Sequence, residues 1–562
     1  MSPITVFAAR RILTMNPAQP EATHLAVRDG RILAVGDLAR CRAWGPAELD
    51  ERFAQQVLLP GFVEGHCHLK EGGMWAWPYL GWFDRRDPAG EVWNGLRSMD
   101  EVVQRLAAID AQMPAGEPLV AWGFDPIYFG GERMSTRHLD RVGDGSRCIV
   151  IGHANGHVMN VNSAMLRRAG IDAECEVEGV GRFPEGGPDA GQPDGELAEP
   201  AAMYLVLRHI GQAGLIAPMD DAGMRGFAAI ACREGVTTAT DLVNKLTEAD
   251  VALLRRHTDD EGFAVRLVPA FQAFHGTHGA AAGAEHVRSL VQGNTERLRF
   301  GLVKMMLDGS IQGFSARLRW PGYFSHPRGP QANGIWVTAP SQYEADAEVY
   351  HRAGLTVHTH TNGDEASEVA VQAWSRILAH APRPGHRHTL QHGQMIDRAL
   401  FERMAALGLG ANLFANHLWY WGDAHHDVTM GPDRAHRLDA CRSALQAGVR
   451  LAIHSDAPVT PLAPLFTAWC AVHRLTPSGR VLGAHERLSV PEALQAITWG
   501  AAWTLGLEHE IGSLEVGKRA DCAVLDEDPL SSDPMRLKDL RVAATVLGGR
   551  VFRPGELAAA AR

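Results

Sequence analysis

Two histidines at the end of an apolar run are the first residues of this chain that could do chemistry. The run Val57-Leu58-Leu59 leads into Pro60-Gly61-Phe62-Val63-Glu64-Gly65-His66-Cys67-His68, which predicts a buried strand over residues 57–66. Side chains two positions apart on a strand point to the same face, so His66 and His68 are expected to converge. Two neutral imidazoles that converge are good ligands for Zn²⁺ or a similar divalent metal. A bare His-x-His pair also arises by chance among 27 histidines, so further ligands are needed to support this interpretation.

Later apolar runs supply those further candidates. Lys304, His360, His392 and Asp456 each lie at or near the end of such a run. A charged lysine is costly to bury, which leaves two interpretations for Lys304: a side chain that reaches the surface, or a neutral or carbamylated group inside the fold. A carbamylated lysine carries a carboxylate that can bridge two metals. Asp456 has an alternative interpretation as a helix cap or turn residue.

The elements that position these residues alternate between strand-like and helix-like runs, which is typical of a parallel sheet. Eight strands are predicted, over residues 57–66, 236–241, 264–271, 300–307, 355–360, 388–392, 409–414 and 449–456. We therefore predict an α/β fold, a (β/α)₈ or TIM barrel, in which catalytic residues lie at the carboxyl ends of the strands. His358 and His454 are expected on the same faces as His360 and Asp456, one layer deeper.

The two ends of the chain differ from this middle part, because both contain short strand-like runs and tight turns. We predict one small β-sandwich domain built from residues 1–56 and 505–562 around a barrel of residues 57–504. About 170 residues separate the first two predicted barrel strands, too many for one connection. Residues of about 70–220 are therefore expected to form an inserted subdomain over the barrel mouth.

Composition narrows the class of protein. The 562 residues carry a net charge of −11, with no basic run of five or more, which argues against nucleic acid or an anionic membrane as a partner. The N-terminus shows no pattern of a signal peptide, and no uncharged apolar stretch is long enough to suggest a membrane span. The eight scattered cysteines are expected to be reduced thiols of a cytoplasmic protein. No phosphate-binding glycine motif supports a nucleotide site.

The order His-x-His, Lys, His, His, Asp on successive predicted strands resembles that of the amidohydrolase superfamily of metal-dependent hydrolases. Within it the chain is similar to the YtcJ-like branch, which includes N-substituted formamide deformylase. The supporting motifs are Leu59-Pro60-Gly61-Phe62-Val63-Glu64-Gly65-His66-Cys67-His68, Gly156-His157, Asn162-Ser163, Gly235-Val236-Thr237-Thr238, Val303-Lys304, Asp308-Gly309-Ser310, His360, Gly363-Asp364, Gln391-His392-Gly393-Gln394, Ser455-Asp456-Ala457-Pro458 and Gly512-Ser513-Leu514-Glu515-Val516-Gly517-Lys518-Arg519-Ala520-Asp521. The likeness extends to nearly the whole chain.

The resemblance implies a binuclear metal centre, with Zn²⁺ the expected ion and Mn²⁺ or another divalent ion as an alternative. One ion would be held by His66, His68 and Asp456, and the other by His360 and His392, with a carbamylated Lys304 and a hydroxide between them. Metal binding lowers the pKa of water from about 15.7 toward 7. Asp456 would accept the proton of that water as it attacks a carbonyl, and then deliver it to the leaving nitrogen.

The substrate pocket is expected to draw on the insertion and on the loop after the lysine strand. His157 and Asn155 are candidates for hydrogen bonds to the substrate, with His157 polarising its carbonyl; a structural loop pair is the alternative. This chain has Asn155-Gly156-His157 where the branch commonly has Asp-Gly-His, which puts the usual substrate contacts there in doubt. The other candidate lining residues are Trp75, Trp77, Trp82, Trp122, Phe124, Phe314, Arg317 and Trp320. The tryptophans are equally explained by core packing.

The expected activity is hydrolysis of a C–N bond in an amide, formamide, lactam or carbamate. The expected partners are small molecules, including bulky or aromatic ones, and a homodimer remains open. An alternative on the same fold is hydrolytic deamination of an amino-heterocycle, which usually uses one metal and a glutamate near the third-ligand strand. Asp364-Glu365 after His360 keeps this alternative open, whereas Lys304 argues against it. A non-catalytic scaffold or binding protein would be signalled by missing ligands, and all six are present.

Overall fold

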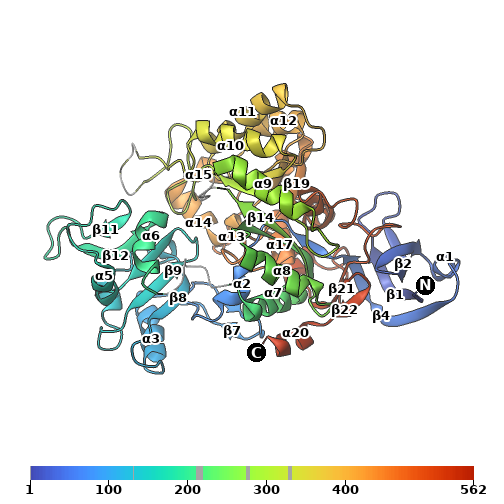
Figure 1. Ribbon diagram of the computed structural model, residues 1–562, viewed down its shortest axis with the longest axis horizontal. Helices are drawn as coiled ribbons and strands as arrows, with labels where there is room; N and C mark the ends of the chain where they lie inside the picture. The colour runs from blue at the N-terminus through green and yellow to red at the C-terminus, as the bar shows by residue number, and fades with distance from the viewer. Residues whose placement is uncertain are drawn as a thin grey trace.

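The structure is a computed structural model that describes residues 2–130, 132–210, 219–273, 279–326, 329 and 332–561. Three sheets with three or more strands lie in this part of the chain. In Figure 1 the eight-stranded sheet lies at the centre, a five-stranded sheet at the left and the sheet of the chain ends at the right.

The central sheet contains all eight predicted barrel strands. Its order is β19-β18-β17-β16-β15-β14-β13-β5, and every neighbouring pair is parallel. The strands are β5 Phe62–Glu64, β13 Val236–Asn244, β14 Arg266–Gln272, β15 Leu302–Met306, β16 Thr356–Thr361, β17 Thr389–His392, β18 Gly410–Leu413 and β19 Arg450–Ile453. The α/β fold with a curled parallel sheet is thus confirmed.

The two edge strands of this sheet, β5 and β19, are joined by the segments that follow them and not by a ladder between the strands themselves. In the part of the chain that the structure describes, the ladder has no β5–β19 pair. Instead, the backbone N–H of Asp456 donates to the carbonyl of His66 at 3.1 Å, and that of His68 donates to Ala457 at 2.7 Å. The two edges of the curled sheet are therefore joined by the segments that carry three of the predicted metal ligands.

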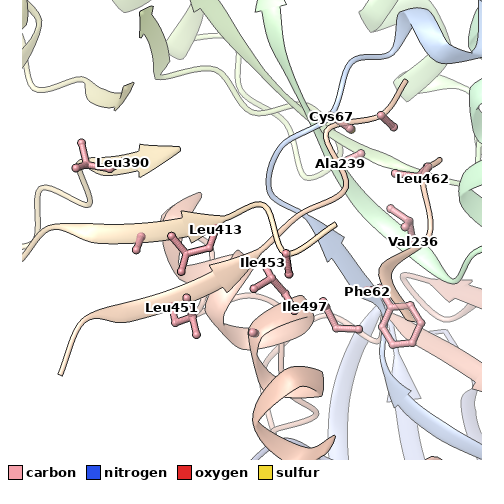
Figure 2. Close-up of a cluster of buried hydrophobic side chains, with 14 of the residues drawn as sticks. Phe62, Cys67, Val236, Ala239, Leu390, Leu413, Leu451, Ile453, Leu462 and Ile497 are labelled. Atoms are coloured by element: carbon pink, nitrogen blue, oxygen red, sulfur yellow. The ribbon is translucent and has the colours of Figure 1, made fainter. Parts of the chain in front are cut away.

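Helices cover the outside of the central sheet, because every second side chain of a strand points outward and is buried against them. Leu451 and Ile453 of β19 face outward and lie beside Ile497 in the main hydrophobic core, as Figure 2 shows. The residue between them, Ala452, belongs to an inner cluster with Leu505 and Ile511, which fill the end of the barrel opposite the predicted site. The helices along this part of the chain are α8 Glu248–Asp259, α9 Gly279–Val291, α10 Pro340–Arg352, α11 Asp364–His380, α12 Arg398–Leu407, α13 His417–Tyr420, α14 Gly422–Ala424, α15 Pro432–Ala435, α16 Cys441–Gln446, α17 Pro464–His473, α18 Val490–Gln495 and α19 Ala501–Thr504.

The run predicted as one strand over residues 57–66 is two strands in two sheets. It is divided at Gly61, between β4 Ala47–Pro60 and β5 Phe62–Glu64. A Cβ atom at Gly61 would lie 2.0 Å from the hydroxyl oxygen of Thr237, so only glycine fits where the chain passes from one sheet to the other. The prediction of a single strand was wrong, because periodicity does not reveal a change of sheet within an apolar run.

The two chain ends share one seven-stranded sheet, in the order β22-β21-β20-β4-β1-β2-β3. Residues of both ends, among them Phe7, Leu25, Val524 and Val546, pack into one buried cluster. Division into two separate sandwich layers, and the domain boundaries at 56/57 and 504/505, stay predictions. The remaining elements here are β1 Ile4–Leu13, β2 Glu21–Arg28, β3 Arg31–Gly36, α1 Leu38–Arg42, β20 Cys522–Leu525, β21 Val542–Leu547, β22 Arg550–Phe552 and α20 Pro554–Ala560.

The long stretch between β5 and β13 contains a further sheet, in the order β11-β12-β10-β9-β8. Its elements are α2 Lys70–Met74, β6 Arg85–Arg86, β7 Val92–Trp93, α3 Met99–Asp110, β8 Leu119–Phe124, α4 Thr136–Leu139, β9 Ile149–His153, β10 Val158–Val161, α5 Ser163–Ala169, β11 Val180–Arg182, β12 Pro193–Ala198, α6 Glu199–Leu207 and α7 Asp221–Arg233. We call residues 65–235 the insertion; the separate subdomain predicted for residues of about 70–220 stays a prediction. No helix in the described ranges is long and apolar enough to cross a membrane.

Candidate metal centre

Five of the six predicted ligands lie at the carboxyl ends of their strands or in the turns that follow, and Lys304 lies in the middle of β15. Each of the six residues is at most 8% exposed. Asp456 is the shared neighbour: its Oδ1 lies 3.1 Å from Nε2 of His66 and 3.2 Å from Nε2 of His68, and its Oδ2 lies 3.9 Å from Nδ1 of His392. Residues nearly 400 positions apart in the sequence are therefore brought together as the resemblance implied.

The backbone is unusual at two of these residues. Asp456 has φ +52° and His392 has φ +68°, in the left-handed region that non-glycine residues rarely adopt. In β17 the side chain of Leu390 packs outward, so regular alternation would also direct His392 outward. The left-handed turn places its ring 4.4 Å from that of His360 and 4.5 Å from that of His66 instead. Such strained backbone is typical of functional sites.

A chain of hydrogen bonds fixes which nitrogen of His66 carries a proton. The carbonyl of Thr504 can only accept, so Nε2 of His358, at 2.9 Å, carries a hydrogen and Nδ1 of His358 is an acceptor. The Nε2 amide of Gln391 donates to this Nδ1 at 2.7 Å, which turns Oε1 of Gln391 toward Nδ1 of His66, also at 2.7 Å. Asn412 donates to the same Oε1 at 3.0 Å, in agreement with this orientation. His66 therefore carries its hydrogen on Nδ1.

This assignment leaves the other nitrogen of His66, Nε2, as an acceptor directed at a carboxylate. Burial lowers the pKa of His66 to about 4, so the ring is neutral at pH 7. Two acceptors 3.1 Å apart repel each other unless a cation lies between them. The donor set therefore fits a divalent metal ion.

His360 is prepared for a ligand in the same manner. Its Nε2 lies 3.1 Å from the carbonyl of Gly309 and 3.2 Å from the side-chain amide nitrogen of Asn362, so the protein engages Nε2 and leaves Nδ1 available. Burial lowers the pKa values of His360 and His392 well below that of free histidine. Neutral imidazoles are the form in which histidine binds metals.

Lys304 lies in β15, at the depth of His358 in the neighbouring strand. Among the described residues, no hydrogen-bond or ion-pair partner reaches its Nζ, and it is 2% exposed. Burial lowers the pKa of this amine to about 7, against a smaller opposing effect of Asp456. A substantial fraction is therefore uncharged at neutral pH, the form in which an amine can add CO₂.

His454 is a further imidazole beside the predicted ligands. Its Nε2 lies 3.2 Å from Nδ1 of His392, and its ring stacks on that of His66 at 4.5 Å with an angle of 14°. A metal ion that an imidazole binds lies in the plane of that ring. The rings of His454 and His66 are nearly parallel and stacked, so no single metal position lies in both ring planes. His454 and His66 are thus not arranged to bind the same ion, whereas His454 can orient His392 by a hydrogen bond. This agrees with the expectation that His454 supports the ligands.

The predicted substrate residues of the insertion follow β9. The backbone N–H of His157 donates to Oδ1 of Asn155 at 2.9 Å, so these two residues form a compact turn. A charge on His157 would lower the pKa of His360, which places His157 within electrostatic reach of the predicted ligands. Asn155 approaches Gly313 in the loop after β15. Both residues are half-buried at the border between the insertion and the barrel.

The predicted aromatic wall is divided between two packed groups. Trp75, Trp77 and Trp122 belong to one cluster with Tyr79, and Trp122 is only 2% exposed. Phe124 is fully buried in a second cluster, against which Trp82 packs. In the loop after β15, Phe314 contacts Tyr323 and His326, Arg317 pairs with Glu365 at 2.9 Å, and Trp320 is 94% exposed. Substrate contacts of all these residues stay predictions.

Sequence reasoning missed an aromatic cavity between the insertion and the barrel loops. It has a volume of about 20 Å³, and its lining includes Trp82, Tyr128, Tyr420, Trp421 and Val459. Tyr420 and Trp421 follow β18 by several residues, and Tyr128 lies in a short 3₁₀ turn after β8. No spacing in the sequence connects these positions, since the contact depends on how the insertion folds back. The sequence could have suggested Gln391 as a functional residue, because it directly precedes a predicted ligand on the same strand.

Comparison with known proteins identifies the family. The sequence profile of the amidohydrolase family matches residues 54–553. The chain belongs to the amidohydrolase family. It is 26% identical to the putative amidohydrolase YtcJ of Bacillus subtilis strain 168, over 96% of this chain and 97% of that protein. It is 25% identical to N-substituted formamide deformylase of Arthrobacter pascens, over 96% of both chains.

Solved structures agree on the fold of this amidohydrolase. An uncharacterized metal-dependent hydrolase from Pyrococcus horikoshii superposes with a TM-score of 0.68 at 20% identity, over 94% of this chain and 99% of that one. The resemblance stated from the sequence is confirmed, and the protein is an enzyme, a hydrolase.

Proposed function

We propose that this amidohydrolase uses divalent metal ions to hydrolyse the C–N bond of an amide, formamide, lactam or carbamate. The observation that carries the proposal is the pair of acceptors formed by His66 Nε2 and Asp456 Oδ1, 3.1 Å apart at the mouth of the barrel. Membership of the family and similarity to a protein named as a formamide deformylase support the choice of bond.

In this proposal His66, His68 and Asp456 would hold one ion, and His360 and His392 would hold the second. Lys304, as a carbamate formed with CO₂, would supply further oxygen ligands. Zn²⁺ suits a set of neutral imidazoles and carboxylates best, and Mn²⁺ is the alternative for sites richer in oxygen. When bound, such ions lower the pKa of a water molecule and polarise a carbonyl oxygen.

The protein's own residues supply proton transfer and orientation. Asp456 is ionised at neutral pH and faces the His66–His68 pair, so it can take a proton from the attacking water and return it to the leaving nitrogen. His157 is the candidate for a hydrogen bond to the substrate carbonyl, with Asn155 holding its backbone in place.

The proposed substrates are small molecules, including ones with an aromatic or bulky apolar group. The aromatic side chains around the small cavity between the insertion and the loop after β18 support this choice, because the lining of that cavity includes Val459 and Pro461, which follow Asp456. All eight cysteines are free, which agrees with a reducing compartment such as the cytoplasm.

Deamination of an amino-heterocycle has weaker support. It needs an acid close to the third-ligand strand, and the two acids after His360 are engaged elsewhere. Glu365 accepts two hydrogen bonds from Arg317, at 3.0 and 3.2 Å. Asp364 accepts the backbone N–H of Arg319 at 2.8 Å.

The test is metal analysis followed by a hydrolysis screen of the Zn²⁺- and Mn²⁺-loaded protein. N-acyl amides, formamides, lactams, carbamates and amino-heterocycles are the substrate classes. One to two equivalents of metal with release of acid and amine support the proposal, and His66→Ala or His392→Ala should abolish both. Ammonia released from a ring amine would favour deamination, and full activity without metal would refute the metal-dependent proposal.

A further inference from the structure

Arg85 of the insertion is a buried arginine whose guanidinium group joins two segments of the candidate metal centre. Its Nη1 donates to the carbonyl of Pro458 at 2.7 Å, and its Nη2 donates to the carbonyl of Thr460 at 3.2 Å. The same Nη2 pairs with Oε1 of Glu71 at 2.7 Å. The residues Arg85 and Glu71 are 6% and 2% exposed, so both charges are removed from water.

The partners of Arg85 lie directly after predicted metal ligands. Glu71 is in α2, three residues after His68, and the two carbonyl acceptors begin two residues after Asp456. The turns that carry His68 and Asp456 come from opposite edges of the central sheet. A single guanidinium group therefore contacts both edges beside the site, in addition to the two backbone hydrogen bonds that join them.

Aromatic rings fix the position of this group. The Cζ atom of Arg85 lies 4.9 Å from the ring centre of Trp122 and 6.0 Å from those of Trp75 and Tyr79. Aromatic faces restrict the conformations of this buried guanidinium. Its hydrogen bonds therefore cost less conformational entropy than those of an unrestrained arginine side chain. The insertion thus presents Arg85 to the barrel in one orientation.

We propose that Arg85 is a positioning residue that sets the metal affinity of the His66–His68–Asp456 site, by holding the turns after His68 and Asp456 at a fixed separation. This inference rests on the metal assignment of the proposed function. The insertion is thereby more than a cover for the barrel mouth, because it contributes a structural element of the metal centre. Outer contacts of this kind typically change metal affinity about 10- to 100-fold when they are removed.

The test compares full-length variants by their Kd for Zn²⁺, measured on metal-free protein in competition with a chelator. Arg85→Met removes the charge and all three hydrogen bonds, and we expect a Kd weaker by about 10- to 100-fold. Arg85→Lys keeps the charge, but an ammonium group lacks the planar guanidinium that reaches two carbonyls and a carboxylate together. We therefore expect its Kd to be at least about threefold weaker than that of the parent. Glu71→Gln should also weaken the affinity.

Arg147 supplies the matched control. It is another arginine of the insertion, with Nε 2.5 Å from Asp110 and Nη1 2.8 Å from the carbonyl of Pro114. It lies before β9, at the other end of that strand from the Asn155–His157 turn. We expect Arg147→Met to lower the thermal midpoint of the metal-free protein while its Zn²⁺ affinity stays within twofold of the parent.

Three results would overturn the inference: a Kd of Arg85→Met within twofold of the parent, an equal loss in Arg147→Met, or full recovery in Arg85→Lys. Should Arg85→Met not fold, as judged by circular dichroism, the Kd values of Arg85→Lys and Glu71→Gln decide the question. The measurement needs no substrate, so the test of Arg85 remains valid even if the proposed reaction is wrong. A parent protein that binds no metal would refute the proposed function itself.

Discussion

The side chains of His66 and Gln391, from opposite parts of the barrel, meet at 2.7 Å between Nδ1 and Oε1. The amide of Gln391 cannot rotate without losing its bond to His358, whose own proton is committed to the carbonyl of Thr504. A backbone carbonyl near the closed end of the barrel therefore determines, through two side chains, which nitrogen of His66 is available to a metal.

Gln391→Met is predicted to weaken Zn²⁺ binding about 10- to 100-fold, because His66 becomes free to place its hydrogen on the nitrogen that faces Asp456. The chelator-competition Kd measures this effect. Gln394→Met is the control, since Gln394 is equally buried and hydrogen-bonds His425, which is not a predicted ligand, at 2.9 Å. Equal losses in the two variants would mean that Gln391 only stabilises the fold.

Lys304 is predicted to carry a carbamate in the metal-loaded enzyme. A buried amine with a pKa of about 7 has the uncharged form that CO₂ requires, and it lies within electrostatic reach of His66, His360 and His392. Native mass spectrometry or a crystal structure should reveal the added group. Lys304→Ala should lose activity and regain part of it with short carboxylic acids, which replace the missing carboxylate; a free ammonium in the loaded enzyme would contradict this.

Asp456→Asn is predicted to lower kcat at least about a hundredfold, as expected for loss of a general acid–base group. Asparagine keeps the size and some hydrogen bonding of the side chain but cannot accept the proton. The measurement is kcat per folded, metal-loaded molecule, with metal content and KM changing far less. Turnover within a few fold of the parent would remove Asp456 from proton transfer.

Three buried histidines, His351 in α10 and His386 and His388 before β17, are predicted to make the fold sensitive to acid. Nδ1 of His388 accepts the N–H of Val357 at 3.0 Å, and its Nε2 lies 2.8 Å from Nδ1 of His351. Burial lowers the pKa of His388 well below that of an unfolded histidine, about 6.5, and also lowers those of His351 and His386. Below about pH 6.5 the unfolded chain therefore binds more protons, and stability falls with decreasing pH.

Urea unfolding at pH 7.5 and 5.5 measures this dependence. The midpoint of the parent should be lower at pH 5.5, and His388→Asn, which does not titrate, should show a smaller difference between the two pH values. An equal difference would assign the acid sensitivity to other groups.

The proximity of the candidate ligands was predictable, because the ends of parallel strands in a curled sheet converge and His66, Lys304, His360 and Asp456 follow or lie in apolar runs; their binding of metal stays a prediction. The inward direction of His392 could not be derived in this way, since alternation after Leu390 directs it outward and only the left-handed backbone reverses it. The break at Gly61 was missed for a similar reason, because one apolar run serves two sheets.

The pocket was the least predictable part. Trp122 and Phe124 were candidates for a substrate wall by residue type, and the structure buries both in clusters of the insertion. Tyr420 and Arg85 belong to the same region but become neighbours only through tertiary contacts of the insertion with the barrel loops. Such contacts depend on packing between distant segments, which spacing along one sequence does not encode.

The backbone hydrogen bonds from His68 to Ala457 and from Asp456 to His66 join the two edges of the central sheet. His66, His68 and Asp456 belong to the candidate metal centre, so the site lies at this junction. Ions held there would cross-link the first and last strands of the curled sheet, between which the described residues form no ladder. Metal binding is thus expected to act on folding as well as on chemistry, with chelation increasing local opening at this junction first. Hydrogen exchange of the His68 and Asp456 amides should quicken when metal is removed, while the amides of β15 and β16 stay protected.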